Sequence, residues 1–94
     1  MTRQSEALAA TPTRVLVLGR SQNTLDTVMQ GLAQLGYPTR GSTRPERAAE
    51  DFDPAGFDLV AIGGGIDGPT RAAIKRAFAE RNPAIRLVDV EAPV

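Results

Sequence analysis

The sequence contains no cysteine and no histidine, and aromatic residues make up only 4% of its 94 residues. Without cysteine the chain has no disulfide and no thiolate nucleophile. Without histidine it lacks the commonest metal ligand and the side chain that titrates most readily near neutral pH. The usual serine triad is excluded for the same reason. The composition therefore weighs against catalysis.

The chain also has no net charge, since its 11 Lys and Arg residues balance its 11 Asp and Glu residues. A nucleic-acid-binding domain usually presents a broad cationic surface and aromatic side chains that stack on bases, so we expect no nucleic-acid partner. No stretch is apolar and long enough to span a bilayer or to serve as a signal peptide. We therefore expect a cytoplasmic protein with no membrane partner.

What the sequence does contain is a regular alternation of strand-like and helix-like segments. Residues 15–18 and 59–62 are apolar at every position, which is typical of strands covered on both faces. Further strands are expected at 37–42, which is polar and resembles a sheet edge, and at 85–90. Apolar residues at helical spacing lie between the strands. The pattern is βαβαβαβ with short connections, which predicts a parallel sheet in one α/β domain over residues 14–94, after a loose tail over 1–13.

Local signals predict where the three helices begin. Ser21 or Asn23 can cap the first helix. Residues 43–46, Thr-Arg-Pro-Glu, match a capping box, in which the threonine oxygen accepts from a backbone N–H and the glutamate reaches back to the cap. Asp67 precedes the third helix and is interpreted as its N-cap rather than as a catalytic acid. Asp58 is expected to be a solvated turn residue.

Right-handed crossovers and a single reversal of direction predict the strand order 2-1-3-4. The first helix then covers one face of the sheet, and the second and third helices cover the other. Strands three and four have no helix of this chain on the first face, although their side chains are apolar, and strand four has an open edge. We expect a homodimer formed through this strand, with the interface residues Ile85, Leu87, Val88 and Val90. The alternatives are that residues 1–13 and 91–94 fold back as a cover, or that a strand from an unidentified protein partner completes the sheet.

Several stretches resemble the receiver domain of two-component response regulators, which has a flavodoxin-like three-layer fold. The similar stretches are 14–19 (RVLVLG), 35–37 (LGY), 48–50 (AAE) and 56–60 (GFDLV), and they are spread over most of the chain. The resemblance implies a βα-alternating signalling module that docks to partners or dimerises. It also implies which residues should stand at the functional positions.

The positions that the resemblance makes functional are altered in this chain. Gly19 and Arg20 stand where a receiver has an acidic pair, and Gly63 stands where it has the phosphoacceptor aspartate. The lysine of a fifth strand has no counterpart. Without carboxylates there is no Mg²⁺ site, and without the acceptor there is no phosphoryl transfer. We therefore expect a pseudo-receiver that is not an enzyme, binds no metal or cofactor, and acts as a protein-interaction or signalling module.

A second resemblance is to NADP-dependent reductases of the atypical short-chain type. It rests on residues 40–48 (RGSTRPERA), where an arginine of that family can meet the 2′-phosphate of the cofactor. The glycine fingerprint after the first strand fails, because Ser21 and Thr24 occupy its second and third glycine positions. The catalytic Tyr-x-x-x-Lys pair is also absent. Dinucleotide chemistry is therefore a weaker expectation.

The ends of the predicted strands also suggest a small anion or nucleotide site, which is the alternative to an interaction module. Three helix N-termini and a glycine loop are expected at this rim, where backbone N–H groups can meet a phosphate or a carboxylate. The candidate residues are Arg20, Ser21, Arg44, Gly63, Gly64, Gly65 and Arg71. Two alternatives stay open: the arginines pair with Glu46, Asp67 or solvent, and the glycines form an ordinary turn. Asp89 either points to this rim or protects the exposed edge.

Overall fold

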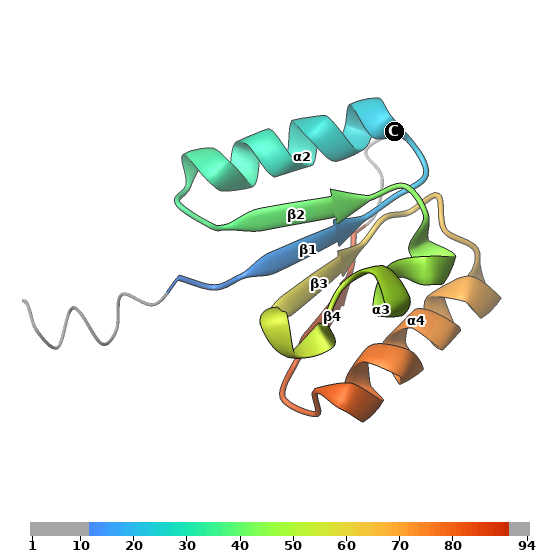
Figure 1. Ribbon diagram of the computed structural model, residues 1–94. Coiled ribbons are helices and arrows are strands. Elements are labelled where there is room, and N and C mark those ends of the chain that lie inside the picture. Colours follow the sequence, from blue (N-terminus) through green and yellow to red (C-terminus); the bar gives the residue numbers. More distant parts are fainter. Residues whose placement is uncertain (1–11, 91–94) are drawn as a thin grey trace, which may run out of the picture.

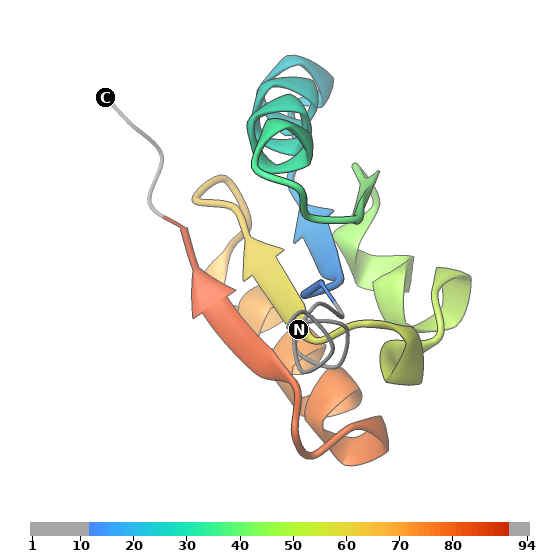
Figure 2. The same ribbon diagram turned by 90° about the vertical axis from the view of Figure 1, so that its left-hand side faces the viewer.

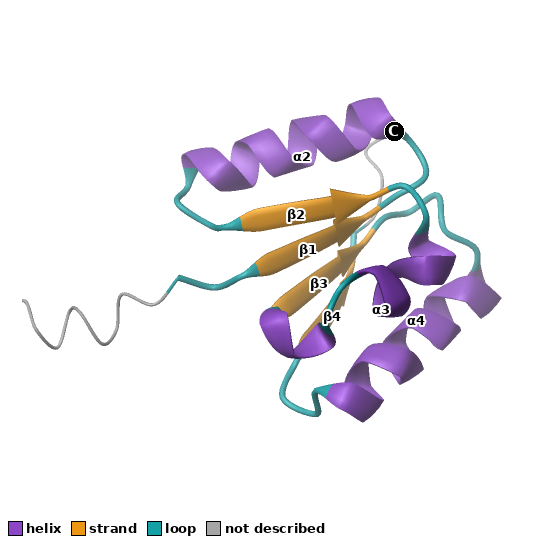
Figure 3. Cartoon of the chain, viewed as in Figure 1, coloured by secondary structure: helices purple, strands orange, loops and turns teal. Residues whose placement is uncertain are grey.

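The computed structural model describes residues 12–90 and has helices on both sides of one sheet (Figures 1 and 3). Nearly all of the predicted tail over 1–13, and residues 91–94, lie outside the described residues. The elements in chain order are β1 (Val15–Leu18), α2 (Gln22–Gln34), β2 (Thr39–Ser42), the 3₁₀ turn η1 (Pro45–Arg47), α3 (Ala48–Asp51), the 3₁₀ turn η2 (Pro54–Gly56), β3 (Leu59–Ile62), α4 (Gly68–Arg81) and β4 (Arg86–Asp89).

The four strands form one parallel sheet in the order β2-β1-β3-β4, which confirms the predicted fold class and strand order. The register aligns Val15 with Thr39 on one side and with Leu59 on the other, and Leu59 with Arg86. Both central strands are apolar and largely buried. The edge strand β2 is polar, as expected. The arrangement is flavodoxin-like or Rossmann-like.

The helices divide between the two faces as predicted, but the two faces are packed unequally. One face packs against α3 and α4 and holds nine buried apolar residues, with Phe78 and Leu16 completely inaccessible. The other face packs against α2, and its buried cluster holds only Val15, Val17 and Leu25, while the buried Ala61 lies on this face outside the cluster. Since α2 contacts β1 and β2, it leaves the β3 and β4 part of this face without a helix. Figure 2 shows α2 over β1 and away from the edge formed by β4.

Local side-chain chemistry marks the start of the first helix, its end, and the start of the last helix. The Ser21 hydroxyl accepts a hydrogen bond from the Thr24 N–H, so Ser21 rather than Asn23 is the N-cap of α2. Gly36 follows this helix with a φ of 93°, a conformation that glycine adopts without strain. Asp67 caps α4 by accepting from both the backbone N–H and the hydroxyl of Thr70. The cap predicted at Asp67 is therefore confirmed.

The capping box predicted at residues 43–46 is wrong. The chain forms a 3₁₀ turn there without a side-chain cap, and the Arg44 N–H donates to Ser42 instead. The Glu46 side chain contacts Arg20 from a different loop. A partner distant in sequence therefore replaces the local bond that the pattern indicated.

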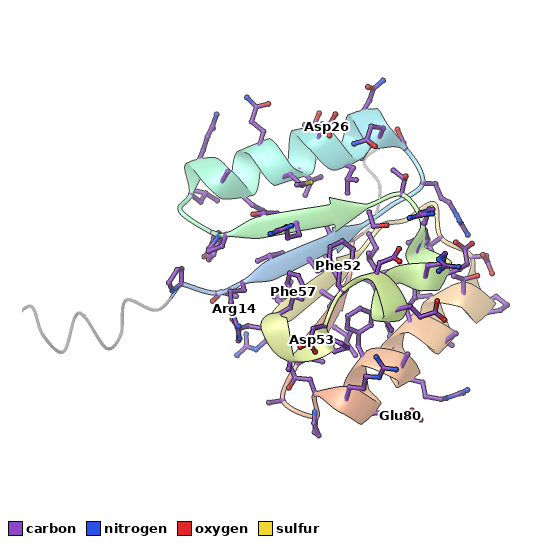
Figure 4. All side chains as sticks on the ribbon, in the orientation of Figure 1. Arg14, Asp26, Phe52, Asp53, Phe57 and Glu80 are labelled. Carbon is purple, nitrogen blue, oxygen red and sulfur yellow. The ribbon has the colours of Figure 1, made fainter. Side chains whose placement is uncertain are left out.

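After the short α3, Phe52 and Phe57 meet edge to face at 5.9 Å, and Figure 4 shows these two rings side by side.

Asp58 is a half-exposed residue at a bend, as the sequence suggested, and it also has a partner within the chain that the sequence did not reveal. Its carboxylate accepts from the Arg14 backbone N–H at 2.8 Å and from the Arg14 guanidinium at 3.0 and 3.1 Å. These contacts join the starts of β1 and β3. The side-chain hydrogen bonds of Arg14, followed by its backbone N–H, lower the pKa of Asp58 from 3.8 to about 2.

The Asp58 contacts predict a pH-dependent contribution to stability. Because the pKa of Asp58 is lower in the folded chain, the contribution is complete above a pH of about 4 and is lost as the pH falls toward about 2. Asp58→Asn should lower the Tm by about 2–4 °C at neutral pH, since the pair is exposed and screened. The difference in Tm between Asp58→Asn and the original chain should shrink below pH 3. The control is Asp26→Asn on the outer surface of α2 (Figure 4); an Asp58 effect equal at both pH values would contradict the assignment.

Candidate functional site

A pocket of about 280 Å³ lies where β1 and β3 end. It is bounded by the loop from β1 to α2, by the first turns of α2 and by the glycine loop after β3. The chain leaves β1 toward one edge of the sheet and leaves β3 toward the other. This is the topological switch point, where open α/β sheets commonly bind ligands. The lining residues are Val17, Leu18, Gly19, Arg20, Ser21, Thr24, Leu25, Val28, Ala61, Gly63, Gly64, Gly65 and Val90.

Five of the seven residues predicted for an anion site line this pocket, and two do not. Arg20, Ser21 and Gly63 to Gly65 are among the lining residues. Arg44 lies beside a different hollow, next to α3, and its guanidinium is 3.5 Å from Asp51. Arg71 lies at the start of α4 and points to backbone carbonyls. The structure therefore does not bring the three arginines together around one ligand position.

The charge of Arg20 is balanced at the rim of the pocket. Its guanidinium forms an ion pair with Glu46 and lies 3.7 Å from Asp67. The hydrogen bond from Arg20 lowers the pKa of Glu46, and hydrogen bonds from Thr70 are the main reason that the pKa of Asp67 is lowered. Both carboxylates are therefore ionised at neutral pH. Two carboxylates around one guanidinium make this rim a poor attractor for anions.

Arg71 ties the glycine loop to β4. Its Nη2 donates to the carbonyls of Gly63 at 3.1 Å and Ile66 at 2.8 Å, and its Nη1 pairs with Asp89 at 2.9 Å. Lys75 also binds Asp89, at 2.9 Å, and these two cations lower the pKa of that carboxyl. Asp89 therefore turns toward α4, and Arg71 satisfies carbonyls that would otherwise lack a side-chain partner.

Arg71→Leu should destabilise the fold by about 1–3 kcal/mol, because the loop carbonyls lose charged donors in a site where the side chain is only 20% exposed. Chemical denaturation measures the change. Arg76→Leu, on the exposed surface of the same helix, is the control and should shift stability by less than about 0.5 kcal/mol. Equal effects of the two substitutions would show that the Arg71 hydrogen bonds contribute nothing.

The glycines of the pocket differ in what the fold requires of them. A Cβ on Gly63 would lie 3.0 Å from the Leu18 carbonyl oxygen, so a side chain there would crowd the β1 backbone. A Cβ on Gly19 would meet nothing within 4 Å, and one on Gly65 would meet only the aliphatic part of Arg20 at 3.8 Å. Neither has a positive φ. Steric crowding therefore favours glycine at Gly63, whereas no such crowding acts at Gly19 or Gly65.

The four predicted interface residues occupy different environments. Ile85 is buried in the core, and Leu87 packs against the same cluster. Val88 and Val90 are 41% and 37% exposed. The register places Val88 beside Ala61 and Arg86 beside Leu59, on the side of the sheet that α2 covers only in part. We call this surface the open face; its residues are Leu59, Ala61, Arg86, Val88 and Val90.

The outer edge of β4 presents backbone groups. The N–H groups of Arg86 and Val90 donate to β3, to the carbonyls of Asp58 and Ile62. Because the direction of backbone groups alternates along a strand, those of Leu87 and Asp89 point away from the sheet. Within residues 12–90 no strand lies beyond them. Among the described residues this edge is unpaired, in agreement with the open edge expected from the sequence.

Sequence reasoning missed the apolar wall of the pocket. Its aliphatic side chains, Val17, Leu25, Val28, Ala61 and Val90, come from β1, α2, β3 and the end of β4. The sequence pattern indicates only that these residues belong to the hydrophobic core or to the edge of the sheet. Helical spacing signals that Leu25 and Val28 face the sheet, but only the three-dimensional arrangement shows that the sheet beside them is left partly uncovered.

Among residues 12–90, Asp and Glu side chains do not gather in groups of three or more that could hold a metal ion. None of the helices in the described part is both long and apolar enough to cross a bilayer. No family model matches the chain, and no curated protein is similar to it.

Proposed function

We propose that this chain is a non-catalytic, receiver-like interaction module in signalling, and that it associates with a second copy of itself through the outer edge of β4. The main support is the exposure of Val88 and Val90 on a strand whose outer backbone groups meet no neighbour within the described residues. An apolar edge with free backbone donors and acceptors pairs readily with another strand.

The two edges of the sheet differ, and the difference favours β4 as the interface. The other edge strand, β2, has the sequence Thr-Arg-Gly-Ser, and polar or charged side chains discourage strand pairing. β4 has the sequence Arg-Leu-Val-Asp; its arginine is exposed at the start of the strand, and its aspartate is occupied by Arg71 and Lys75. β4 therefore presents apolar side chains together with an open edge, which β2 does not.

Two-fold pairing of antiparallel β4 strands fits the direction of these groups. With the axis at Val88, Leu87 of each copy lies opposite Asp89 of the other, and both residues direct their backbone groups outward. The two Val88 side chains then lie opposite each other on the open face. The pairing extends the sheet across both copies and joins the two open faces into one surface.

Sedimentation velocity and equilibrium across about 1–100 µM protein test the proposal. The expected result is a concentration-dependent rise from the monomer mass of 10.0 kDa to twice that value, without added ligand. Amide hydrogen exchange should show that Leu87 and Asp89 become protected as the dimer forms. A chain that stays monomeric and soluble throughout this range would rule out self-association.

The alternative function, binding of a small anion or nucleotide, has weaker support. In its favour, Arg20, Ser21 and the glycine loop line one pocket. Against it, Arg20 is paired with Glu46 and lies near Asp67, so the rim holds more negative than positive charge. A phosphate titration followed at the amides of the glycine loop separates the two functions, because only the alternative predicts saturable shifts there.

A further inference from the structure

The pocket at the ends of β1 and β3 shares Ala61 and Val90 with the open face, but the proposed pairing uses the backbone groups of Leu87 and Asp89 at the outer edge of β4. Edge pairing of β4 extends the sheet sideways, whereas the pocket lies behind that edge, between α2 and β3. Of its lining residues only Arg20 is charged, and that charge is already matched by Glu46. The remaining wall is formed mainly by aliphatic side chains and glycines.

The glycines at the mouth of this pocket keep it open. Gly19 and Gly65 have ordinary negative or extended backbone angles, and each has room for a Cβ. Glycine in a parallel α/β loop is commonly required by positive φ or by tight packing, and neither requirement applies at these two positions. The fold does not require glycine at Gly19 or Gly65. Because both residues lack a side chain, they leave space in which a bound molecule can contact the backbone.

From these observations we infer that the pocket binds a small, uncharged, predominantly apolar molecule. The volume of about 280 Å³ accommodates on the order of nine or ten non-hydrogen atoms, since a water molecule takes up about 30 Å³ of liquid. Val17, Leu25, Val28 and Ala61 form its apolar contact surface. A charged ligand is disfavoured, because nothing in the wall offers it an unmatched charge.

Indole is a suitable probe because it is uncharged, flat and of the right size. Titration into the ¹⁵N-labelled full chain, at a concentration where the protein is monomeric, should give saturable shifts at Gly19, at the glycine loop and in the first turns of α2. The expected Kd is about 1 mM or below for a ligand of this size. Inorganic phosphate, titrated in parallel, should give no saturable shift at these amides.

Two substitutions fill the pocket from different walls. Ala61→Leu extends from β3 and Val28→Phe extends from α2, and each should weaken indole binding at least 10-fold. The control is Ala79→Leu on the exposed side of α4, away from the pocket, which should leave the Kd unchanged. Because the two substitutions fill the pocket from different elements, the test remains valid if one variant fails to fold.

Each other outcome overturns the inference in a distinct way. Absence of saturable shifts with indole would show that the pocket binds no such ligand. Saturation by phosphate but not by indole would assign it to anions instead. Shifts at the pocket amides that follow protein concentration alone would show that a second copy fills it. Neither the absence of indole shifts nor saturation by phosphate bears on self-association, which sedimentation measures separately.

Discussion

Val88→Lys is expected to convert the protein from a dimer into a monomer under conditions in which the original chain is dimeric. The substitution places an ammonium at the two-fold axis, opposite the same charge from the second copy. Because symmetry introduces the change in both copies, the dimer Kd should rise by about 100-fold or more. Sedimentation equilibrium measures the shift.

The fold of the Val88→Lys monomer should be unchanged, because Val88 is already 41% exposed. Circular dichroism checks this. The matched control is Leu35→Lys, which removes an exposed apolar residue and adds the same charge at the end of α2, where Leu35 is 74% exposed. That variant should dimerise normally. If both lysine variants weaken dimerisation equally, the effect is one of net charge, and the β4 interface is wrong.

Phe78→Ala is expected to lower the free energy of unfolding by about 3–5 kcal/mol. Phe78 is completely buried between α4 and the sheet, in the larger of the two core clusters. Replacing its ring with a methyl group removes apolar contacts and leaves a cavity. A domain of this size has a total stability of about 5–14 kcal/mol, so a measurable fraction of the variant should be unfolded at 37 °C.

Urea denaturation followed by circular dichroism measures the Phe78→Ala effect, since the chain has no tryptophan. The measurement belongs in the Val88→Lys background, because dimerisation stabilises the folded state in a concentration-dependent way. Phe78→Leu is the control and should cost less than about 1.5 kcal/mol. Similar losses for the two variants would show that the ring is not packed as the structure describes.

Much of the fold could be predicted because its signals are local. The apolar stretches at 15–18 and 59–62 formed β1 and β3, and Ser21 and Asp67 capped the helices for which their side chains are suited. The strand order followed from the handedness of βαβ connections. These features depend on the spacing of nearby residues, so one sequence is enough to find them.

The side-chain partners could be predicted only in part, because they join residues far apart in the chain. The pairing of Arg20 with Glu46 was one of two alternatives left open at the rim, and it replaced the local capping role of Glu46. Asp58 keeps contact with solvent but also binds Arg14, which is 44 residues earlier and was not predicted. The strand order shows which loops meet at one end of the sheet, but it does not show which side chains pair there.

The sequence by itself determined the types and order of the elements, the parallel sheet and the presence of Gly19, Arg20 and Gly63 at the strand ends, since these follow from residue type and short-range pattern. Only the tertiary structure decided that Ile85 turns inward while Val88 and Val90 stay on the open face. It also decided that Arg71 holds the glycine loop and that a pocket opens beside α2. The direction in which a side chain points and the enclosure of a pocket depend on how distant segments pack, because a side chain is buried only where another element covers it.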